Sequence, residues 1–172
     1  MLVNISEVLT KPYKAVDETV ELNLSRCDLT FGSYEICHLD PVHLKVEHLR
    51  EKEFHVLIET KMKLDLSCDR CLTEVSHQMD IQGKRHVNLE CSEAELTKEL
   101  DESNFIQGFY LNVEQLLLSE VVLNWPTKIL CREECEGLCK VCGGSKSTGC
   151  DCEDTSLDPR MSVVRDLFQI QD

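Results

Sequence analysis

Six cysteines lie within 22 residues near the end of this 172-residue chain. The residues between them are mostly Gly, Lys, Glu and Ser, so we do not expect apolar packing to bury these thiols. Clustered thiols in polar surroundings are typical of a metal site, and structural zinc takes four sulfur or nitrogen ligands in a tetrahedron. The spacing therefore predicts a structural zinc site, with an iron–sulfur cluster as the alternative. The candidate ligands are Cys131, Cys135, Cys139, Cys142, Cys150 and Cys152.

The sharpest element of this segment is the C-x2-C pair of Cys139 and Cys142 in "GLCKVCGG". This spacing points two thiolates at one cation from a tight turn, and Gly143 can supply the positive φ that such a turn needs. Two further ligands must come from the other four cysteines, and the sequence does not choose among them. A catalytic zinc keeps an open position, usually beside a base, and no HExxH motif is present. We therefore expect no catalysis at the metal.

A second C-x2-C pair, Cys68 and Cys71 in "LSCDRCLTEV", lies between two predicted strands and predicts a hairpin tip. It could form a second metal site, alone or with spare thiols from the tail. It could instead be a redox dithiol, because this spacing lowers a thiol pKa, or a structural turn. Eight clustered cysteines would fill two four-sulfur sites, if the tip and the tail are close. His77 is the histidine to test as a ligand, although a hydrogen-bonded core histidine is the simpler interpretation. The remaining cysteines look isolated: Cys27, Cys37 and Cys91.

The elements that must position these thiols begin with strands. Residues 54–66 are apolar at every second position, with only Thr60 interrupting, which predicts a long strand with one buried face. The pattern recurs at 20–24, 42–46, 75–81 and 87–89. Consecutive strands joined by short polar turns indicate an antiparallel meander.

Two segments predict helices. In the first, Asn112 is the expected N-cap, and the helix must end before Trp125 because a proline follows. The second begins at Asp158 near the end of the chain. The fold class is thus α+β, an antiparallel sheet with one or two helices and a zinc-stapled C-terminal loop.

Three parts are expected along the chain. Residues 1–126 form a β-rich domain, which includes an acidic segment near 90–104. Residues 127–155 form the cysteine-rich metal-binding module. Residues 156–172 form a helix that packs back on the domain.

The chain is strongly acidic, with a formal net charge of −14. Non-specific nucleic-acid binding depends on Lys and Arg neutralising phosphates, so the chain as a whole should be repelled by RNA. A basic protein partner fits the charge better. An RNA contact would need a local patch, for which Lys84 and Arg85 are candidates, although a solvated turn is the simpler interpretation.

The first residues lack the apolar run of a secretory signal, and no stretch approaches a membrane span of about 18 apolar residues. We therefore expect a cytoplasmic protein that does not enter a membrane. In that compartment thiols stay reduced, and the odd total of 11 cysteines also argues against a disulfide framework.

Taken together, "CDRCL" after a long strand, "EGLCKVCG" with a later "CDC", and the closing "DPRMSVVRDLF" resemble the bacterial YceD family, the large ribosomal RNA subunit accumulation proteins. In this family Cys68 and Cys71 match a widespread pair, and the six later cysteines match a tail that only some relatives carry. The resemblance implies a cytoplasmic role in making or stabilising large-subunit ribosomal RNA, and it brings no enzymatic activity.

The expected function is therefore non-enzymatic support of ribosome biogenesis, through a ribosomal protein or assembly factor of the large subunit. One alternative is a zinc protein that contacts ribosomal RNA directly. A rival from another class is an enzyme: a redox protein using Cys68 or Cys71, or a nuclease. A nuclease would need clustered carboxylates for metal ions, and the acidic segment near Glu93 offers no ordered framework for them.

Overall fold

The computed structural model describes residues 1–11, 13–50, 53–88, 105–146 and 149–152. The chain divides into two compact units. Unit 1 comprises Met1–Leu66 and Val75–Thr127, and unit 2 comprises Ser67–Glu74 and Lys128–Asp172. The acidic segment predicted near 90–104 and the helix predicted at 156–172 lie outside the described residues, and the three-part division of the chain stays a prediction.

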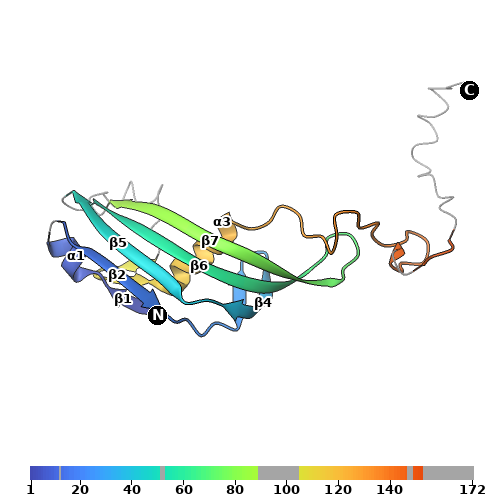
Figure 1. Cartoon of the computed structure of the whole chain (residues 1–172), viewed down its shortest axis with the longest axis horizontal. Helices are drawn as coiled ribbons and strands as arrows, with labels where there is room; N and C mark the ends of the chain where they lie inside the picture. The colour runs from blue at the N-terminus through green and yellow to red at the C-terminus, as the bar shows by residue number, and fades with distance from the viewer. Residues whose placement is uncertain (12, 51–52, 89–104, 147–148, 153–172) are drawn as a thin grey trace, which may run out of the picture. The chain divides into compact units, whose positions relative to one another are not determined.

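The larger of two β-sheets forms most of unit 1 (Figure 1). Its strand order is β2-β5-β6-β4-β3, and β7 also pairs with β6. The β2–β5, β3–β4, β4–β6 and β5–β6 pairings are antiparallel, as the sequence predicted. The strands are β2 (Ala15–Val20), β3 (Arg26–Leu29), β4 (Gly32–Leu39), β5 (Val42–Arg50), β6 (Glu53–Ser67) and β7 (Glu74–Asn88).

The long strand β6 has two consecutive neighbours on one edge. β5 pairs with its first half, where His43 lies opposite Glu59, and β4 pairs with its second half, where Leu39 lies opposite Met62. The break between β4 and β5 falls at Asp40 and Pro41, which suits a proline because it has no N–H to donate to the ladder.

The alternating pattern of 54–66 does bury one face of β6. Every apolar residue in the series is buried, and Thr60, the one polar member, donates its hydroxyl to the Asp40 carbonyl at 2.9 Å. That bond satisfies a hydroxyl that would otherwise be costly to bury. The strand predicted at 20–24 is wrong: β2 ends at Val20, and the next strand begins at Arg26.

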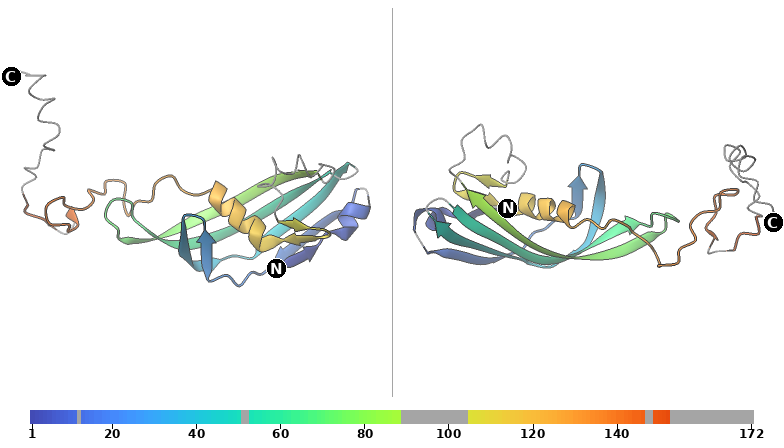
Figure 2. Two further views of the ribbon diagram at one scale, coloured as in Figure 1. Left: turned by 180° about the vertical axis from the view of Figure 1, so that it is seen from behind. Right: turned by 90° about the horizontal axis from the view of Figure 1, so that it is seen from above.

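One face of the large sheet is covered by α3 (Val113–Leu123) together with the small sheet (Figure 2). The small sheet has the order β1-β9-β8, formed by Leu2–Asn4, Tyr110–Asn112 and Ile106–Gln107. A short helix, α1 (Ser6–Thr10), contacts β2 and β5.

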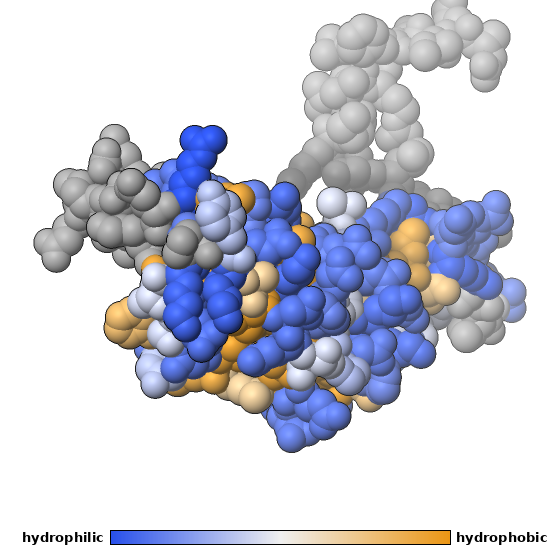
Figure 3. Space-filling model, turned by 60° about the vertical axis from the view of Figure 1, so that its left-hand side comes forward, coloured by the Kyte–Doolittle hydropathy of each residue, from blue (hydrophilic) through white to orange (hydrophobic). Residues whose placement is uncertain are grey.

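Helix α3 follows the sequence prediction closely. The Asn112 side chain accepts the Gln115 N–H at 3.4 Å, and the helix ends at Leu123. Its apolar residues Val113, Leu116, Leu117 and Val121 are buried. None of the helices in the described residues is long and apolar enough to cross a membrane. Figure 3 shows a largely hydrophilic surface in which hydrophobic side chains gather in limited areas.

Candidate metal centres

Four cysteines from two distant segments meet in unit 2. Cys68 and Cys71 come from the turn between β6 and β7, and Cys131 and Cys135 come from the segment after α3. Their Sγ atoms all lie within 4.8 Å of one another, with 3.8 Å from Cys68 to Cys135 and 3.6 Å from Cys71 to Cys131. A disulfide would require about 2.05 Å, so these are free thiols. We call this set cluster 1, and it could hold a metal ion.

Four further cysteines form a second set, cluster 2, within one short segment. They are Cys139, Cys142, Cys150 and Cys152, with all Sγ atoms within 4.8 Å of one another. The Cys142 and Cys150 sulfurs are 3.4 Å apart. The six tail cysteines therefore divide, with the first two joining the hairpin tip and the last four standing together. Cluster 2 could also hold a metal ion.

The two C-x2-C turns have the same backbone hydrogen bonds. In cluster 1 the Leu72 N–H donates to the Cys68 carbonyl at 2.9 Å, and the Cys68 N–H donates to Thr73 at 2.9 Å. In cluster 2 the Gly143 N–H donates to the Cys139 carbonyl at 2.9 Å, and the Cys139 N–H donates to the Gly144 carbonyl at 2.7 Å. Two segments of unrelated sequence thus build one type of turn that aims two thiols the same way.

The residue after the second cysteine has positive φ in both turns. It is Gly143 in cluster 2, at φ 73°, which confirms the conformation predicted for this glycine. In cluster 1 it is Leu72, at φ 60°. A non-glycine residue in the left-handed region costs about 1–2 kcal/mol, so the surroundings of the cluster 1 turn must hold it there.

Asp69 and Arg70, the two residues inside the cluster 1 turn, form contacts that help to keep the turn in this conformation. The Asp69 carboxylate accepts the Ile129 N–H at 2.7 Å, while the Asp69 N–H donates to the Ile129 carbonyl at 2.8 Å. Arg70 Nη1 donates to the Cys135 carbonyl at 2.6 Å. The charged pair in "CDRC" therefore ties the hairpin tip to the segment that carries the other two cysteines.

Backbone N–H groups lower the pKa of one cysteine in each cluster and so favour its thiolate form. Burial raises the pKa of Cys68, but N–H groups of Arg70, Cys71 and Cys131 outweigh it and lower the pKa to about 6. In cluster 2, N–H groups of Cys142 and Val141 lower the pKa of Cys139 to about 6. Such N–H···S contacts also support metal-bound thiolates.

Other thiols of each cluster are held in the protonated form. Hydrogen bonding to Cys135 raises the pKa of Cys131 to about 12. Hydrogen bonding to Cys150 likewise raises the pKa of Cys152 to about 12. Four neighbouring thiolates repel one another, so a cluster without a cation shares protons among its sulfurs. A divalent cation favours the fully deprotonated set, which couples metal binding to proton release.

The residues predicted as an RNA patch lie on β7 in unit 1. Lys84 is exposed, whereas Arg85 points to the covered face and pairs with Glu120 of α3 at 2.6 Å. Gly83 makes room for this pair, because a Cβ there would lie 2.4 Å from the Glu120 carboxyl carbon. Glu120 was not among the functional residues predicted from the sequence. Its place on the buried face of α3, opposite the inward side of β7, was the available signal.

The other candidate residues belong to neither cluster. His77 is half-buried on β7 and belongs to neither four-cysteine set. Cys27 is buried on β3, Cys37 is exposed on β4, and Cys91 is outside the described residues. Among the described residues, only the two cysteine clusters bring three or more metal-ligating side chains together.

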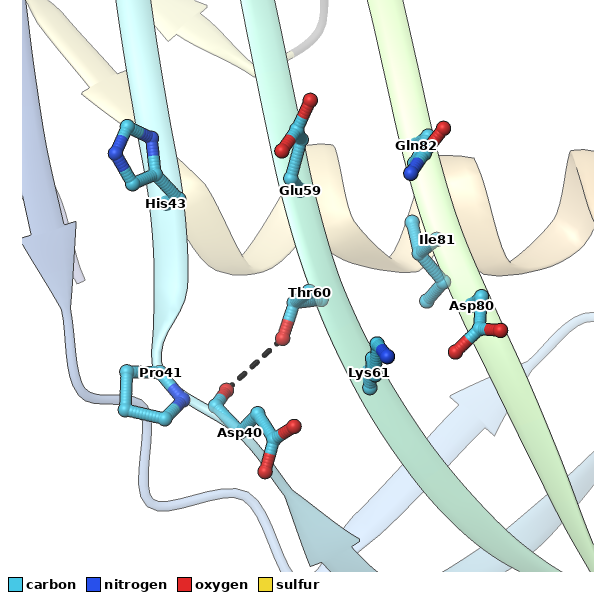
Figure 4. A pocket seen from close by; sticks show the side chains of 9 residues that line it. All are labelled: Asp40, Pro41, His43, Glu59, Thr60, Lys61, Asp80, Ile81 and Gln82. Atoms are coloured by element: carbon cyan, nitrogen blue, oxygen red, sulfur yellow. Dashed lines mark hydrogen bonds between the residues drawn. The ribbon is translucent and has the colours of Figure 1, made fainter.

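A surface pocket of about 330 Å³ lies over β5, β6 and β7 of unit 1 (Figure 4). Carboxylates of Asp40, Glu59 and Asp80 line it together with Lys61 and His43. Its charges are mixed, and its acidic side chains do not converge on a common point (Figure 4). The arrangement of these side chains therefore does not make the pocket a candidate catalytic or metal-binding site.

Fold and sites together define a cysteine-rich α+β protein with two candidate four-thiol metal centres. The sequence profile described as "Large ribosomal RNA subunit accumulation protein YceD" matches residues 56–168. Because this match covers well over half of the chain, the chain belongs to the YceD family. The matched region contains all eight cysteines of clusters 1 and 2.

Relatives include two mycobacterial proteins. The chain is 26% identical over 101 residues to the uncharacterized protein ML1660 of Mycobacterium leprae, covering 59% of this chain and 46% of that protein. It is 28% identical over 101 residues to the uncharacterized protein Rv2926c of Mycobacterium tuberculosis, covering 59% and 49%. The chain thus spans about half the length of the curated relatives it matches. No solved structure matches it.

Proposed function

We propose that this protein supports the accumulation of large-subunit ribosomal RNA as a non-enzymatic binding protein whose unit 2 is held by two structural zinc ions. The observation that carries the proposal is the division of eight cysteines into two sets of four, inside the region that matches the YceD family. The family description supplies the process, and the clusters supply the chemistry.

Zinc is the proposed metal because the sulfur spacing suits it. A tetrahedral site with Zn–S bonds of about 2.3 Å places its sulfurs about 3.8 Å apart. The paired sulfurs of cluster 1 are 3.8 and 3.6 Å apart, and those of Cys142 and Cys150 are 3.4 Å apart. An iron–sulfur cluster also uses four cysteines, but it would colour the purified protein. Zinc leaves the protein colourless.

A binding role is favoured over catalysis by the completeness of the clusters. Four sulfurs fill the shell of a tetrahedral zinc, whereas catalytic zinc sites keep one position open. In the redox alternative, Cys68 and Cys71 would exchange electrons with each other. Each of them also lies beside a sulfur of the other segment, Cys135 or Cys131, as a shared metal site requires and a two-cysteine redox pair does not.

The proposed partner is a basic ribosomal protein or assembly factor of the large subunit. The chain has 32 acidic residues against 18 Lys and Arg. Such a charge attracts a basic protein and repels ribosomal RNA. The exposed Lys84 lies close enough to influence Glu47, whose carboxylate also pairs with Lys45, so this area is not purely basic. The proposed setting is the cytoplasm, where thiols stay reduced.

A pull-down from cells that carry this gene tests the proposal. The tagged protein is captured with and without a chelator, and both the proteins and the RNA are read. We expect basic large-subunit proteins or assembly factors, with reduced recovery after chelation. Recovery of neither ribosomal protein nor ribosomal RNA would contradict the function. Tight, salt-dependent binding of purified ribosomal RNA to the isolated protein would replace the protein partner with direct RNA contact.

Deletion of the gene gives the complementary test. The ratio of large-subunit to small-subunit ribosomal RNA should fall in the deletion strain and recover with the wild-type gene. Cys37→Ser, which changes an exposed thiol outside both clusters, should restore the ratio as well as the wild type does. Cys131→Ser should restore it poorly. An unchanged ratio in the deletion strain would remove the main support for the proposal.

A further inference from the structure

Three aromatic side chains meet in unit 1 where the β3–β4 hairpin reaches the C-terminal end of α3. The Phe31 and Trp125 ring centroids are 5.0 Å apart, and those of Tyr34 and Trp125 are 4.7 Å apart. The Phe31 and Tyr34 centroids are 6.1 Å apart. These separations fall in the range of favourable aromatic pairs. We call these three residues the aromatic cluster.

The aromatic cluster is more exposed than a packing contact requires. Phe31 is 49% exposed, although it is a large apolar residue at a hairpin turn. On the last turn of α3, Val122 is 43% exposed and Leu123 is 63% exposed. A contact that served only to fix the hairpin against the helix would bury Phe31. An exposed aromatic group beside exposed aliphatic side chains is instead typical of an interaction surface.

The charge around the cluster favours a cation as the occupant. The C-terminal end of a helix carries a partial negative charge, and α3 has no basic residue in its last turn. The charged hairpin residues Arg26, Asp28 and Glu35 lie on the strand face opposite Tyr34, because side chains alternate along each strand, so they do not set the charge beside the rings. Aromatic ring faces also attract cations. A phosphate would be repelled by the same helix end, which disfavours a nucleotide stacked on these rings.

We propose that the aromatic cluster is the docking point for an arginine side chain of a basic protein segment, with the guanidinium against the rings and near the C-terminal end of α3. Arginine suits the place better than lysine, because its planar guanidinium stacks on aromatic faces and is more weakly hydrated. This inference rests on the proposed function, since it names how the basic partner is held.

The only tryptophan of the chain, Trp125, reports on this site. The full-length protein is titrated with a blocked eight-residue peptide of alternating arginine and glycine, and Trp125 emission is followed at constant ionic strength. We expect a saturable change in emission, and weaker binding of the matching lysine–glycine peptide. An octauridine RNA should leave the emission unchanged. Equal affinity for the arginine and lysine peptides, or tighter binding of octauridine, would overturn the proposal.

Two variants test whether the peptide binds to the rings of the aromatic cluster rather than to the acidic protein in general. Phe31→Leu keeps the apolar bulk but removes a ring, and should weaken the arginine peptide about two- to fivefold. Phe109→Leu removes an aromatic ring that is exposed on the β8–β9 turn, and should have no effect. Thermal unfolding of both variants checks that each is folded. Equal loss in both variants, or in neither, would show that the peptide does not use the cluster.

Two variants of Leu123 that introduce opposite charges test the role of electrostatics. If the aromatic cluster were only structural, neither variant would change the affinity for the peptide. Leu123 is exposed, so neither change should disturb the core. Leu123→Glu should strengthen peptide binding, and Leu123→Arg should weaken it. A concentration-dependent Trp125 emission without peptide, lost in Phe31→Leu, would show that a second copy of this chain occupies the cluster, and would overturn the proposal.

These outcomes can be distinguished from failure of the proposed function. If the peptide leaves Trp125 unchanged while pull-downs still recover basic large-subunit proteins, only the docking point is wrong. If the peptide binds at Trp125 while pull-downs recover no ribosomal component, the proposed function is wrong and the cation site remains.

Discussion

Clusters 1 and 2 use the same C-x2-C turn for different structural purposes. The paired sulfurs of cluster 1 belong to residues 60 and 67 positions apart, whereas those of Cys142 and Cys150 are 8 positions apart. A metal in cluster 1 would close a long loop, and a metal in cluster 2 would order a short segment. Closing a long loop removes more unfolded-state entropy than closing a short one. Two similar sets of ligands can therefore constrain chain segments of very different length.

The C-x2-C turns of the two clusters also differ in how much the surrounding residues support them. Cluster 1 has contacts that do not depend on metal, from Asp69, Arg70 and the Thr73 hydroxyl, which lies 3.2 Å from the Cys71 sulfur. The positions of Leu72 and Thr73 are occupied in cluster 2 by Gly143 and Gly144. Glycines relax the turn but offer no side chain to hold it. We therefore expect cluster 2 to depend more completely on its metal.

The largest expected effect comes from Cys131→Ser. Losing a ligand of cluster 1 should release the hairpin tip from the segment after α3, because the metal link between them is gone. Hydrogen exchange should rise at residues 68–73 and 128–135, while the paired strands of unit 1 stay protected. The exposed thiol variant Cys37→Ser is the control, and it should match the wild type. Unchanged exchange at both segments would show that cluster 1 does not join them.

Cys142→Ser should have a smaller and more local effect. Its loss should raise hydrogen exchange within residues 138–150 and leave residues 68–73 as protected as in the wild type. The Leu138–Ser145 backbone bridge lies within this segment and is a convenient probe. Increased exchange at 68–73 in this variant would mean that the clusters are coupled rather than independent.

Asp69→Ala tests the non-metal contacts of cluster 1. Removing the carboxylate that accepts the Ile129 N–H should weaken metal binding at cluster 1 by about tenfold, as for other groups that orient metal ligands. Competition with a chelator of known affinity measures the change. Asp69 is not part of cluster 2, so the metal affinity of cluster 2 in the same variant serves as the internal reference. A drop at cluster 2 of equal size would contradict the account.

The smallest effects come from exchanging the turn residues. Gly143→Ala places a side chain at φ 73° and should destabilise cluster 2 by about 1 kcal/mol. Leu72→Gly relieves the same strain at φ 60° and should stabilise cluster 1 by up to about 1 kcal/mol. Chelator-driven metal release followed by circular dichroism measures both. Effects of the same sign in the two variants would show that the turns are not equivalent.

Sequence patterns predicted those features that depend only on residues close together in the chain. The alternation in 54–66, the Asn112 cap and the positive φ of Gly143 depend on such short-range relations. The β3–β4 hairpin was missed because β3 has only 4 residues and because a register shift between Ile36 and His38 interrupts the alternation in β4. Leu72 was missed because leucine gives no sign of a left-handed conformation.

The partition of the cysteines could not be predicted, because it depends on where the chain returns after α3. Nothing in "CDRC" or "CREEC" states that Cys71 and Cys131 meet. The pairing of Arg85 with Glu120 needed the same knowledge, since the two lie 35 residues apart on different elements. Once Cys131 and Cys135 join Cys68 and Cys71 in cluster 1, the other four cysteines form cluster 2. The eight clustered cysteines are thus divided equally between two sites.

Native mass spectrometry with elemental analysis tests the central claim most directly, which is that unit 2 contains two independent four-thiol zinc sites. We expect two zinc ions per wild-type chain, one in Cys131→Ser, one in Cys142→Ser and none in the double variant. One ion in the wild type, or loss of both ions from either single variant, would contradict it.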